Sequence, residues 1–323
     1  MAIKSEYKWR PPRFKLKMFK DSFKYYKSRN PPPDLKNIID FNHPNLSKVR
    51  KISTVENKVH NWEKLGLKPL NKWNIYELIT VPGLIYIENP FTEFGQQNWI
   101  LKCVKDFSRK PNKLNLDAHS LLHDNESWWE ACFKEPKSEQ KLLTKLRWAT
   151  QGYHHNWDTK HYSEDSKTEM SKDLCDLTEL LATTLGFSEF KAEAAIVNYY
   201  RMNSTLAGHT DHSEINVEAP LFSISFGQSA IFLIGGRSQQ DPAEALFLRS
   251  GDIVVMSKSS RLSYHGVPKI LRAEIQPWEY YENPNPDSRI NEEDWCKAKS
   301  YISEARINLN VRQVLKSGQS KLY

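Results

Sequence analysis

Short apolar segments separated by glycines limit how this chain can fold more than any other feature. From Ala192 onward the hydrophobic period shortens toward two, which is typical of half-buried strands. The expected strands cover 195–200, 221–226, 230–234, 245–248, 252–257 and 305–314. Gly227, Gly235-Gly236 and Gly251 fall between them at positions of tight turns. Short strands after a helical first half favour an α+β chain whose core is a two-sheet antiparallel sandwich, a double-stranded β-helix or jelly roll.

The first half of the chain is predicted to place helices and connections around that sandwich. Residues 1–29 contain ten lysines or arginines and two acidic residues, with aromatic residues at helical spacing over 16–28. This basic helix docks its aromatic face on the following domain, contacts phosphates as an arm, or is a mitochondrial presequence. Beyond it we expect a polar connection over 42–70, a turn between apolar runs over 75–87, a helix over 93–107, a charged helical segment over 114–144 and an amphipathic helix over 174–185 ended by Gly186.

Composition narrows the class of protein. The 323 residues suffice for one catalytic domain with extensions. The four cysteines have no C-x-x-C spacing, which indicates reduced thiols in an intracellular compartment and neither a zinc site nor a disulfide framework. No apolar run reaches the roughly 18 residues of a membrane span. The net charge of +7 favours a polyanionic partner.

Polar residues interrupt the strand-rich half at places whose spacing predicts a metal site. His209 and Asp211 are two residues apart, so within a strand both side chains point to one face. His265, in a later apolar segment, adds a second imidazole. Two histidines and one carboxylate leave coordination positions open, which suits a non-heme Fe(II) oxygenase. The alternative, an ordinary surface pair of His209 and Asp211, does not explain why these polar groups share one strand face in apolar segments.

The segment 305–314 predicts a partner for those open positions. Arg306, Asn308 and Arg312 share strand parity, so their donors point to one face. Two guanidiniums on one face would bind the two carboxylates of a small diacid such as 2-oxoglutarate. The alternative interpretation is that the two arginines form exposed salt bridges. It does not explain why both point to the same face of the strand.

Further motifs resemble those of a known family. Asn198-Tyr199-Tyr200 precedes the H-x-D element, and Y-H-G and R-x-N-x-x-x-R follow it. This combination resembles the AlkB family of Fe(II)/2-oxoglutarate nucleic-acid dealkylases. The segments 146–158 and 223–233 resemble the eukaryotic AlkB homologue 1 branch, and similarity extends from about residue 20 to about residue 316.

The resemblance assigns roles to individual residues. It implies that His209, Asp211 and His265 bind iron. It implies that five residues contact 2-oxoglutarate: Asn198, Tyr200, Arg306, Asn308 and Arg312. Arg306 would take the distal carboxylate and Arg312 would support the end near the metal. Fe(II), 2-oxoglutarate and O2 are then the expected cofactors. His212 departs from the family pattern, and strand parity turns it away from the metal, toward substrate or the surface.

The resemblance also implies a nucleic-acid demethylase that releases formaldehyde, CO2 and succinate. Expected substrates are N6-methyladenine in unpaired or bubbled DNA, 1-methyladenine in tRNA, and 5-methylcytosine at a tRNA wobble position. The base must be flipped out or unpaired. Candidates for holding it are Trp148, Tyr153, His155, Tyr162 and Glu214, whereas Trp157 is expected in the core. Two alternatives stay open, the same chemistry on a protein side chain such as a histone lysine, and a non-catalytic nucleic-acid-binding scaffold.

These inferences predict the organisation of the chain. Residues 1–70 would form the basic helix and a wrapping linker, 71–316 the dioxygenase domain, and 317–323 a tail. Within the domain we expect a nucleotide-recognition lid at about 140–170 and the metal and 2-oxoglutarate core at about 192–316. The expected partner is DNA or tRNA, with no membrane and no stable protein partner inferred. The expected location is the nucleus, the mitochondrion or the cytoplasm.

Overall fold

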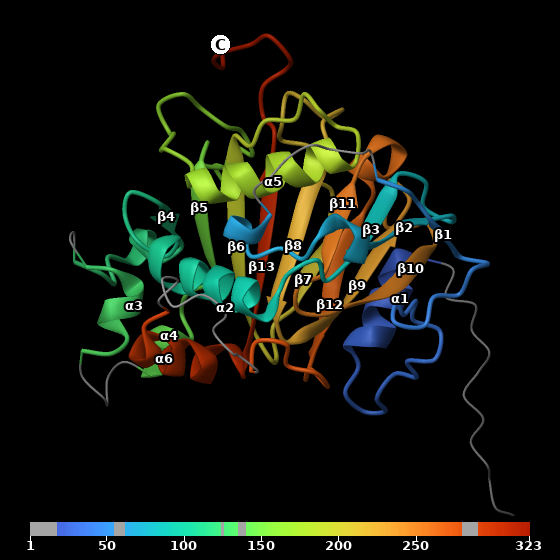
Figure 1. Cartoon of the computed structure of the whole chain (residues 1–323), viewed down its shortest axis with the longest axis horizontal. Coiled ribbons are helices and arrows are strands. Elements are labelled where there is room, and N and C mark those ends of the chain that lie inside the picture. The colour runs from blue at the N-terminus through green and yellow to red at the C-terminus, as the bar shows by residue number, and fades with distance from the viewer. Residues whose placement is uncertain (1–17, 55–61, 124–125, 135–139, 280–289) are drawn as a thin grey trace, which may run out of the picture.

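Two antiparallel sheets form the centre of the computed structural model, which describes residues 18–54, 62–123, 126–134, 140–279 and 290–323 (Figure 1). The larger sheet, in the order β1-β2-β3-β11-β8-β13-β6-β5-β4, consists of β1 (Val49–Lys51), β2 (Asn74–Leu78), β3 (Leu84–Glu88), β4 (Lys113–Leu114), β5 (Trp148–Gly152), β6 (Ala194–Arg201), β8 (Leu221–Gly227), β11 (Ile253–Met256) and β13 (Ala305–Arg312). The smaller sheet, β10-β9-β12-β7, consists of β7 (Leu206–His209), β9 (Ser229–Gly235), β10 (Ala243–Leu248) and β12 (His265–Leu271). The predicted α+β class with a two-sheet core is confirmed.

Helices cover the larger sheet, with α2 and α5 lying across it in Figure 1. The helices are α1 (Phe19–Lys27), α2 (Glu93–Leu101), α3 (Trp128–Ala131), α4 (Gln140–Leu143), α5 (Lys172–Thr184) and α6 (Glu292–Ile302). Shorter turns are η1 (Glu63–Leu65), η2 (Leu70–Lys72), the π-helical η3 (Lys102–Asp106), η4 (Asp117–His119) and η5 (Lys258–Leu262). In the described parts of the chain, no helix has the length and apolar character needed to cross a bilayer.

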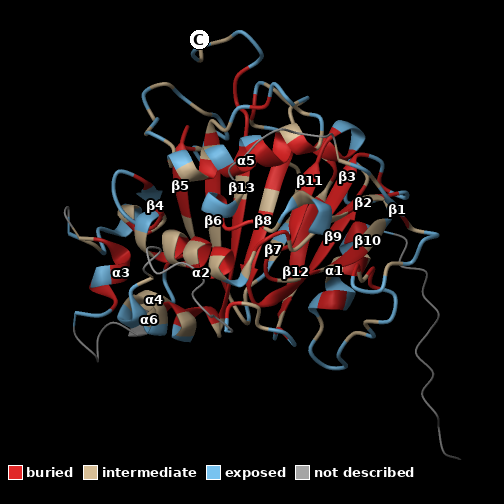
Figure 2. Ribbon diagram, viewed as in Figure 1, coloured by how far each residue is buried: buried red, intermediate tan, exposed pale blue. Residues whose placement is uncertain are grey.

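Strand alternation divides the core into two layers, as the central strand β8 shows. Phe222, Ile224 and Phe226 face the helices and join the cluster that contains the side chains of α2 and α5. Leu221 faces the smaller sheet and joins the cluster between the sheets. Figure 2 shows the central strands as almost continuously buried. Each large apolar side chain buried in this way contributes roughly 1.5–3 kcal/mol, so a one-residue slip in register would be costly.

The helix α1 docks on the smaller sheet beside the strand β7. Phe19 and Tyr26 are buried, and the Phe19 ring meets the Tyr264 ring edge-on, with 4.8 Å between centroids. Gly208 lies against both rings, because a Cβ at that position would overlap Phe19 and Tyr264. Of the three interpretations of this helix, these contacts support docking on the following domain for residues 19–27. The rest of the basic segment, residues 1–17, lies outside the described residues.

Some sequence expectations were wrong. Residues 114–144 do not form one charged helix, because Trp128 and Trp129 are buried and pull this segment into short turns against the core. The Asn115 side chain also accepts hydrogen bonds from the backbone of Arg147 (2.7 Å) and Trp148 (3.2 Å), which ties the segment to β5. The helix α6 was not expected at all, although Asn291 caps it by accepting from the Asp294 backbone at 3.1 Å.

A buried histidine next to β5 predicts how stability depends on pH. His154 is 2 % exposed, and burial lowers its pKa to about 4. The unfolded chain therefore binds this proton at a higher pH than the folded chain, and stability falls as the pH drops below about 6.5. For His154 alone, we expect the free energy of unfolding to be about 2 kcal/mol lower near pH 5 than near pH 8. Urea unfolding of the wild type and of His154→Leu at both pH values measures this contribution. Between pH 8 and pH 5 the wild type should lose about 2 kcal/mol more of its unfolding free energy than the variant.

Candidate active site

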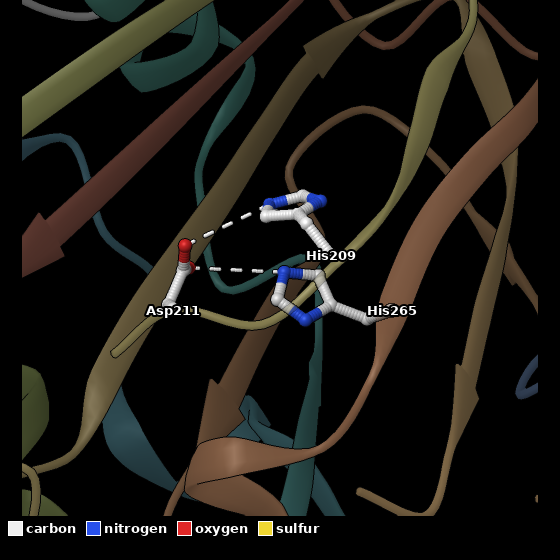
Figure 3. Close-up of side chains that lie close together, drawn as sticks. All are labelled: His209, Asp211 and His265. Carbon is white, nitrogen blue, oxygen red and sulfur yellow. Dashed lines mark ion pairs between the residues drawn. The ribbon is translucent and has the colours of Figure 1, made fainter. Parts of the chain in front are cut away.

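Three potential metal ligands come together between the sheets. His209 ends β7 and His265 begins β12, and the two residues are directly paired in the antiparallel ladder. Asp211 follows β7 and turns its carboxylate toward both imidazoles (Figure 3). The Nε2 atom of His209 lies 3.6 Å from Oδ1, and the Nε2 atom of His265 lies 3.7 Å from Oδ2. One donor atom from each residue falls within 4.8 Å of the others, so the three side chains could hold a single ion.

Local hydrogen bonds present the correct nitrogen of each histidine. The Nδ1 atom of His209 lies 2.9 Å from the carbonyl oxygen of Ala207, and that of His265 lies 3.0 Å from the carbonyl oxygen of Ser263. A carbonyl oxygen only accepts, so both Nδ1 atoms carry the proton. In the neutral imidazole the Nε2 atom is then the acceptor, and in both residues it faces Asp211, as metal-binding histidines require.

The charge states of the cluster also suit a cation. Burial alone would raise the pKa of Asp211, but Arg312, His265 and His209 hold the pKa of that carboxyl well below its usual range. Burial and the neighbouring His209 lower the pKa of His265 to about 4. Near neutral pH the site therefore presents one carboxylate and a neutral His265 imidazole, without a proton that a metal must displace.

One premise of the sequence prediction was wrong, although the grouping was right. Asp211 does not lie in a strand, because β7 ends at His209. Its carboxylate reaches the histidines through the turn after the strand, not by strand parity. His212 follows in the same turn, exposed, with its Nδ1 atom 3.0 Å from the Thr210 carbonyl oxygen and from the Thr210 hydroxyl. It borders the cavity described next, and within the described residues its side chain forms no hydrogen bond or ion pair with the three ligands.

A cavity of about 520 Å³ opens beside the ligands, and its polar wall comes from two paired strands. Asn198 and Tyr200 of β6 and Arg306, Asn308 and Arg312 of β13 all line it. The alternate residues Ile307, Leu309 and Val311 face the helices. The predicted parity of β13 is therefore confirmed.

Arg306 sits at this wall as a buried cation without enough acceptors. It is 1 % exposed, and one Nη2 bond to the Ser225 hydroxyl (2.8 Å) is its hydrogen bond in the structure. Its Nε and Nη1 atoms, and the hydroxyl of nearby Tyr200, have no partner among the described residues. Burial lowers the pKa of Arg306 to about 10, which still leaves it charged near neutral pH. A buried guanidinium with free donors beside a cavity fits the carboxylate of a small acid.

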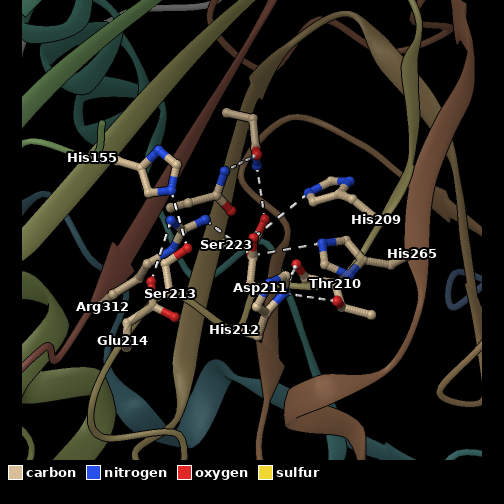
Figure 4. A network of polar contacts seen from close by, with 12 residues as sticks. His155, His209, Thr210, Asp211, His212, Ser213, Glu214, Ser223, His265 and Arg312 are labelled. Carbon is tan, nitrogen blue, oxygen red and sulfur yellow. Dashed lines mark hydrogen bonds and ion pairs between the residues drawn. The ribbon is translucent and has the colours of Figure 1, made fainter. Parts of the chain in front are cut away.

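Arg312 is placed differently from Arg306. Its Nη2 atom donates to Oδ2 of Asp211 at 2.9 Å, and its Nη1 atom lies 3.5 Å from Glu214 (Figure 4). The Nη1 atom also donates to the Tyr162 hydroxyl at 3.2 Å. Burial would lower its pKa, but Asp211 and Tyr162 raise it above its usual value. Arg312 therefore lies at the metal end of the cavity, the position that the family resemblance implied, and contacts a candidate metal ligand directly.

The five residues expected to hold a base have different positions. His155 lines the cavity, with its Nε2 atom 3.1 Å from the Ser213 hydroxyl. Neither Trp148 nor Tyr162 lines the cavity; the Tyr162 ring packs against His155 with 5.4 Å between centroids, and the Trp148 ring packs against Trp157. For Tyr153 the expectation was wrong, because it is 1 % exposed and packs against Val314 and Leu315.

Glu214 borders the cavity but is not a free acceptor for a base. Its side chain is 0 % exposed, and its two oxygens accept from the Tyr162 hydroxyl and from Nη2 of Arg261, each at 2.9 Å. The expected contact with an exocyclic amine is therefore not supported. The sequence offered no sign of this arrangement, because Arg261 lies 47 residues away.

Trp157 is a functional candidate that sequence reasoning assigned to the core. It is 46 % exposed and lines the cavity together with Lys160. Its ring lies 4.6 Å from the His155 ring and 5.3 Å from the Trp148 ring, measured between centroids. Three aromatic rings thus continue from β5 to the cavity rim. The N-W-D sequence around it, between polar residues, was a signal for exposure.

Comparison of the sequence with known proteins shows which family the chain belongs to. Residues 83–312 match the 2OG-Fe(II) oxygenase superfamily. The chain is 40 % identical to mouse nucleic acid dioxygenase ALKBH1, over 93 % of this chain and 85 % of the relative. The chain belongs to this superfamily, in the AlkB family. It is also 32 % identical to the Schizosaccharomyces pombe tRNA demethylase abh1 (92 % and 95 % covered) and 30 % identical to the Arabidopsis thaliana DNA N(6)-methyladenine demethylase ALKBH1A (94 % of each).

Membership identifies the chain as an Fe(II)/2-oxoglutarate-dependent dioxygenase, which uses O2 as well. The residues present fit these groups. The His-Asp-His cluster has the donor set that Fe(II) oxygenases use, and the free donors of Arg306 lie where an acid could bind. The expected fold, enzyme class and cofactors are confirmed.

Proposed function

We propose that this oxygenase removes methyl groups from bases of nucleic acid, with His209, Asp211 and His265 as the iron ligands. The candidate substrates are N6-methyladenine in unpaired DNA and 1-methyladenine in tRNA, with oxidation of 5-methylcytosine at a tRNA wobble position as a third. The names of the mouse, fission-yeast and Arabidopsis relatives support this class of substrate. The single observation that carries it is the cavity rim, where an exposed tryptophan and a lysine stand beside the candidate metal ligands.

The rim has the two features that bind an unpaired nucleotide. Trp157 and His155 offer ring faces or edges on which a base can stack, worth about 1–3 kcal/mol per stacked base. Lys160, three residues after Trp157, also lines the cavity and supplies a cation for the phosphate. A base in a duplex could not reach the ligands, so it must be flipped out or unpaired. We assign residues of about 140–170, which carry this rim, as the nucleotide-recognition lid.

The residues of the chain divide the work of the reaction. Bound Fe(II) supplies the activation of O2 that drives decarboxylation of 2-oxoglutarate and hydroxylation of the methyl group. Arg306, with Tyr200 beside it, binds the distal carboxylate, and Asn198 and Asn308 border the rest of the diacid. Arg312 holds Asp211 in place. The hydroxymethyl group on nitrogen then loses its N–C bond, formaldehyde leaves, and the nitrogen keeps the electron pair and takes up a proton.

A turnover screen tests this function. The full chain is incubated with Fe(II), 2-oxoglutarate and oligonucleotides that carry each methylated base in loop, bubble, single-stranded or duplex form, and formaldehyde is measured. We expect turnover on unpaired substrates and little on duplex. The proposal would be wrong if no nucleic acid yielded formaldehyde or oxidised 5-methylcytosine while methylated histone peptides turned over. The substrate would then be a protein side chain.

Substitution of Trp157 tests the rim. Because its ring is half exposed, Trp157→Ala should leave the fold and the 2-oxoglutarate KM unchanged. The KM for a methylated oligonucleotide should rise roughly 5- to 150-fold, which corresponds to the loss of about 1–3 kcal/mol of stacking. Trp157→Phe should retain part of the affinity. The control is Tyr25→Ala, which removes an exposed ring from α1, far from the rim in sequence. An equal effect of both substitutions would contradict the assignment.

A further inference from the structure

Arg261 is a buried arginine that none of the roles above uses. It is 1 % exposed, and its guanidinium group donates three hydrogen bonds to a single loop. Its Nη1 atom donates to the backbone oxygen of Asp211 at 2.7 Å, its Nε atom donates to the backbone oxygen of Ala219 at 3.0 Å, and its Nη2 atom donates to Glu214 at 2.9 Å. All three acceptors lie in the loop between β7 and β8, which also carries the ligand Asp211.

The segment that carries Arg261 is itself firmly anchored. Arg261 lies in η5, in the turn that leads into β12 and its first residue, His265. Ser257 and Ser260 cap this turn reciprocally, and the Ser257 hydroxyl donates to the Gly83 carbonyl oxygen at 2.8 Å. Arg261 therefore joins two segments that are distant in sequence, one bearing Asp211 and the other His265.

Asp211 needs such a bond because it lies outside the strands. The ladder between β7 and β12 fixes His209 and His265 directly opposite each other, but it ends before Asp211. A metal ligand must be held within about 0.5 Å of its productive position. The Nη1 bond of Arg261 fixes the Asp211 backbone, while the Nη2 bond of Arg312 fixes the Asp211 carboxylate.

We infer that Arg261 is a positioning residue for the oxygenase reaction: it holds the loop from Asp211 to Ala219 so that the Asp211 carboxylate faces His209 and His265. This inference rests on the metal site proposed above. A planar guanidinium can satisfy three acceptors in fixed directions, whereas a lysine ammonium in the same place is a point charge on a shorter reach. The role therefore needs the shape of arginine as well as its charge.

Loss of Arg261 could also affect the metal site through Glu214. This effect must be separated from the loss of the hydrogen bonds between Arg261 and the loop backbone. Glu214 is enclosed, and it joins Arg261 to the Tyr162 hydroxyl at 2.9 Å and to Arg312 at 3.5 Å. Removal of Arg261 leaves this carboxylate buried with less compensation, which by itself could disturb the site. Neutralising Glu214 in the same chain removes that uncompensated charge, while the backbone bonds of Arg261 remain lost.

The test measures metal binding by the full chain, without nucleic acid. Mn(II) is titrated into wild type, Arg261→Gln, Arg261→Lys and the double variant Arg261→Gln/Glu214→Gln, and bound metal is measured by electron paramagnetic resonance. Arg249→Gln is the matched control, because it removes a guanidinium that bonds Asp40 through two 2.8 Å contacts and neither residue lines the cavity. Apo thermal unfolding of each variant is recorded beside the titration.

We expect the Mn(II) Kd to rise about tenfold or more in Arg261→Gln and in the double variant, in the range that loss of groups supporting a ligand produces. Arg261→Lys should keep the charge beside Glu214 and still bind Mn(II) more weakly than wild type. Arg249→Gln should lower the unfolding temperature and leave the Mn(II) Kd unchanged. If Arg261→Gln does not fold, the Mn(II) Kd of Arg261→Lys is the measurement that tests the inference.

Two results overturn the inference. One is an unchanged Mn(II) Kd in the folded Arg261 variants, and the other is a wild-type Kd in the double variant, which would assign the effect to the stranded Glu214 charge. Because no nucleic acid is present, these results are separate from the turnover screen. A chain that binds Mn(II) normally but demethylates no nucleic acid would refute the proposed function and leave the role of Arg261 standing.

Discussion

Asp211→Ala is expected to abolish metal-dependent succinate production. The substitution removes one of three candidate ligands, and loss of residues that only support a ligand already costs about 10- to 100-fold in affinity or activity, so we expect a larger loss here. It also leaves Arg312 without its 2.9 Å carboxylate partner. A buried charge left uncompensated costs about 3–5 kcal/mol; Arg312 keeps Glu214 at 3.5 Å, so the variant should lose less stability than this.

Stability and metal binding can be separated with matched variants. Asp211→Asn keeps an oxygen acceptor for Arg312 and should restore much of the stability without restoring turnover. Asp40→Ala removes the carboxylate that pairs with Arg249 at 2.8 Å outside the cavity, so it should destabilise the fold and leave Mn(II) binding intact. Wild-type succinate production by a well-folded Asp211→Asn would contradict the ligand assignment.

Arg306→Gln is expected to raise the KM for 2-oxoglutarate by roughly thirty-fold or more. This corresponds to about 2 kcal/mol for a charge-assisted hydrogen bond to a carboxylate. The same substitution should increase the stability of the ligand-free protein, because Arg306 is buried there with two nitrogens unpartnered. The two effects have opposite signs, which a general loss of structure cannot produce.

Thermal unfolding with and without 2-oxoglutarate and Mn(II) measures both effects. The wild type should gain stability when the diacid binds, and Arg306→Gln should gain much less. Arg272→Gln is the control, since that arginine is exposed and pairs with Glu304 at 2.9 Å on the surface. An Arg306→Gln variant that is less stable than wild type without ligand and that keeps a wild-type KM would refute the carboxylate clamp.

The sequence predicted those parts of the fold and site that depend on strand alternation. Along β13 the polar residues Arg306, Asn308 and Arg312 line the cavity and the apolar residues between them face the helices, which a period of two determines directly. The pairing of His209 with His265 was also within reach, because both lie in apolar segments that could form neighbouring strands.

The remainder depended on contacts between distant segments, which alternation does not encode. Asp211 reaches the histidines through a turn, and its backbone partner Arg261 is 50 residues away. Tyr153 and Trp157 share one aromatic segment, yet one is buried against Val314 and the other is exposed at the rim. Composition could not separate them, because burial of each ring is decided by what other parts of the chain cover it.

Phe19 packs against Gly208 and Tyr264, and this contact determines which deletions can be used to study the basic N-terminal segment. A truncation that removes residues 1–29 would strip the support from the strand that ends in His209, so weaker activity could not be ascribed to lost phosphate contacts. A shorter deletion that stops at residue 17 spares that support. A comparison of the salt-dependent affinity of this shorter deletion with that of the full chain would isolate what the charged residues 1–17 contribute.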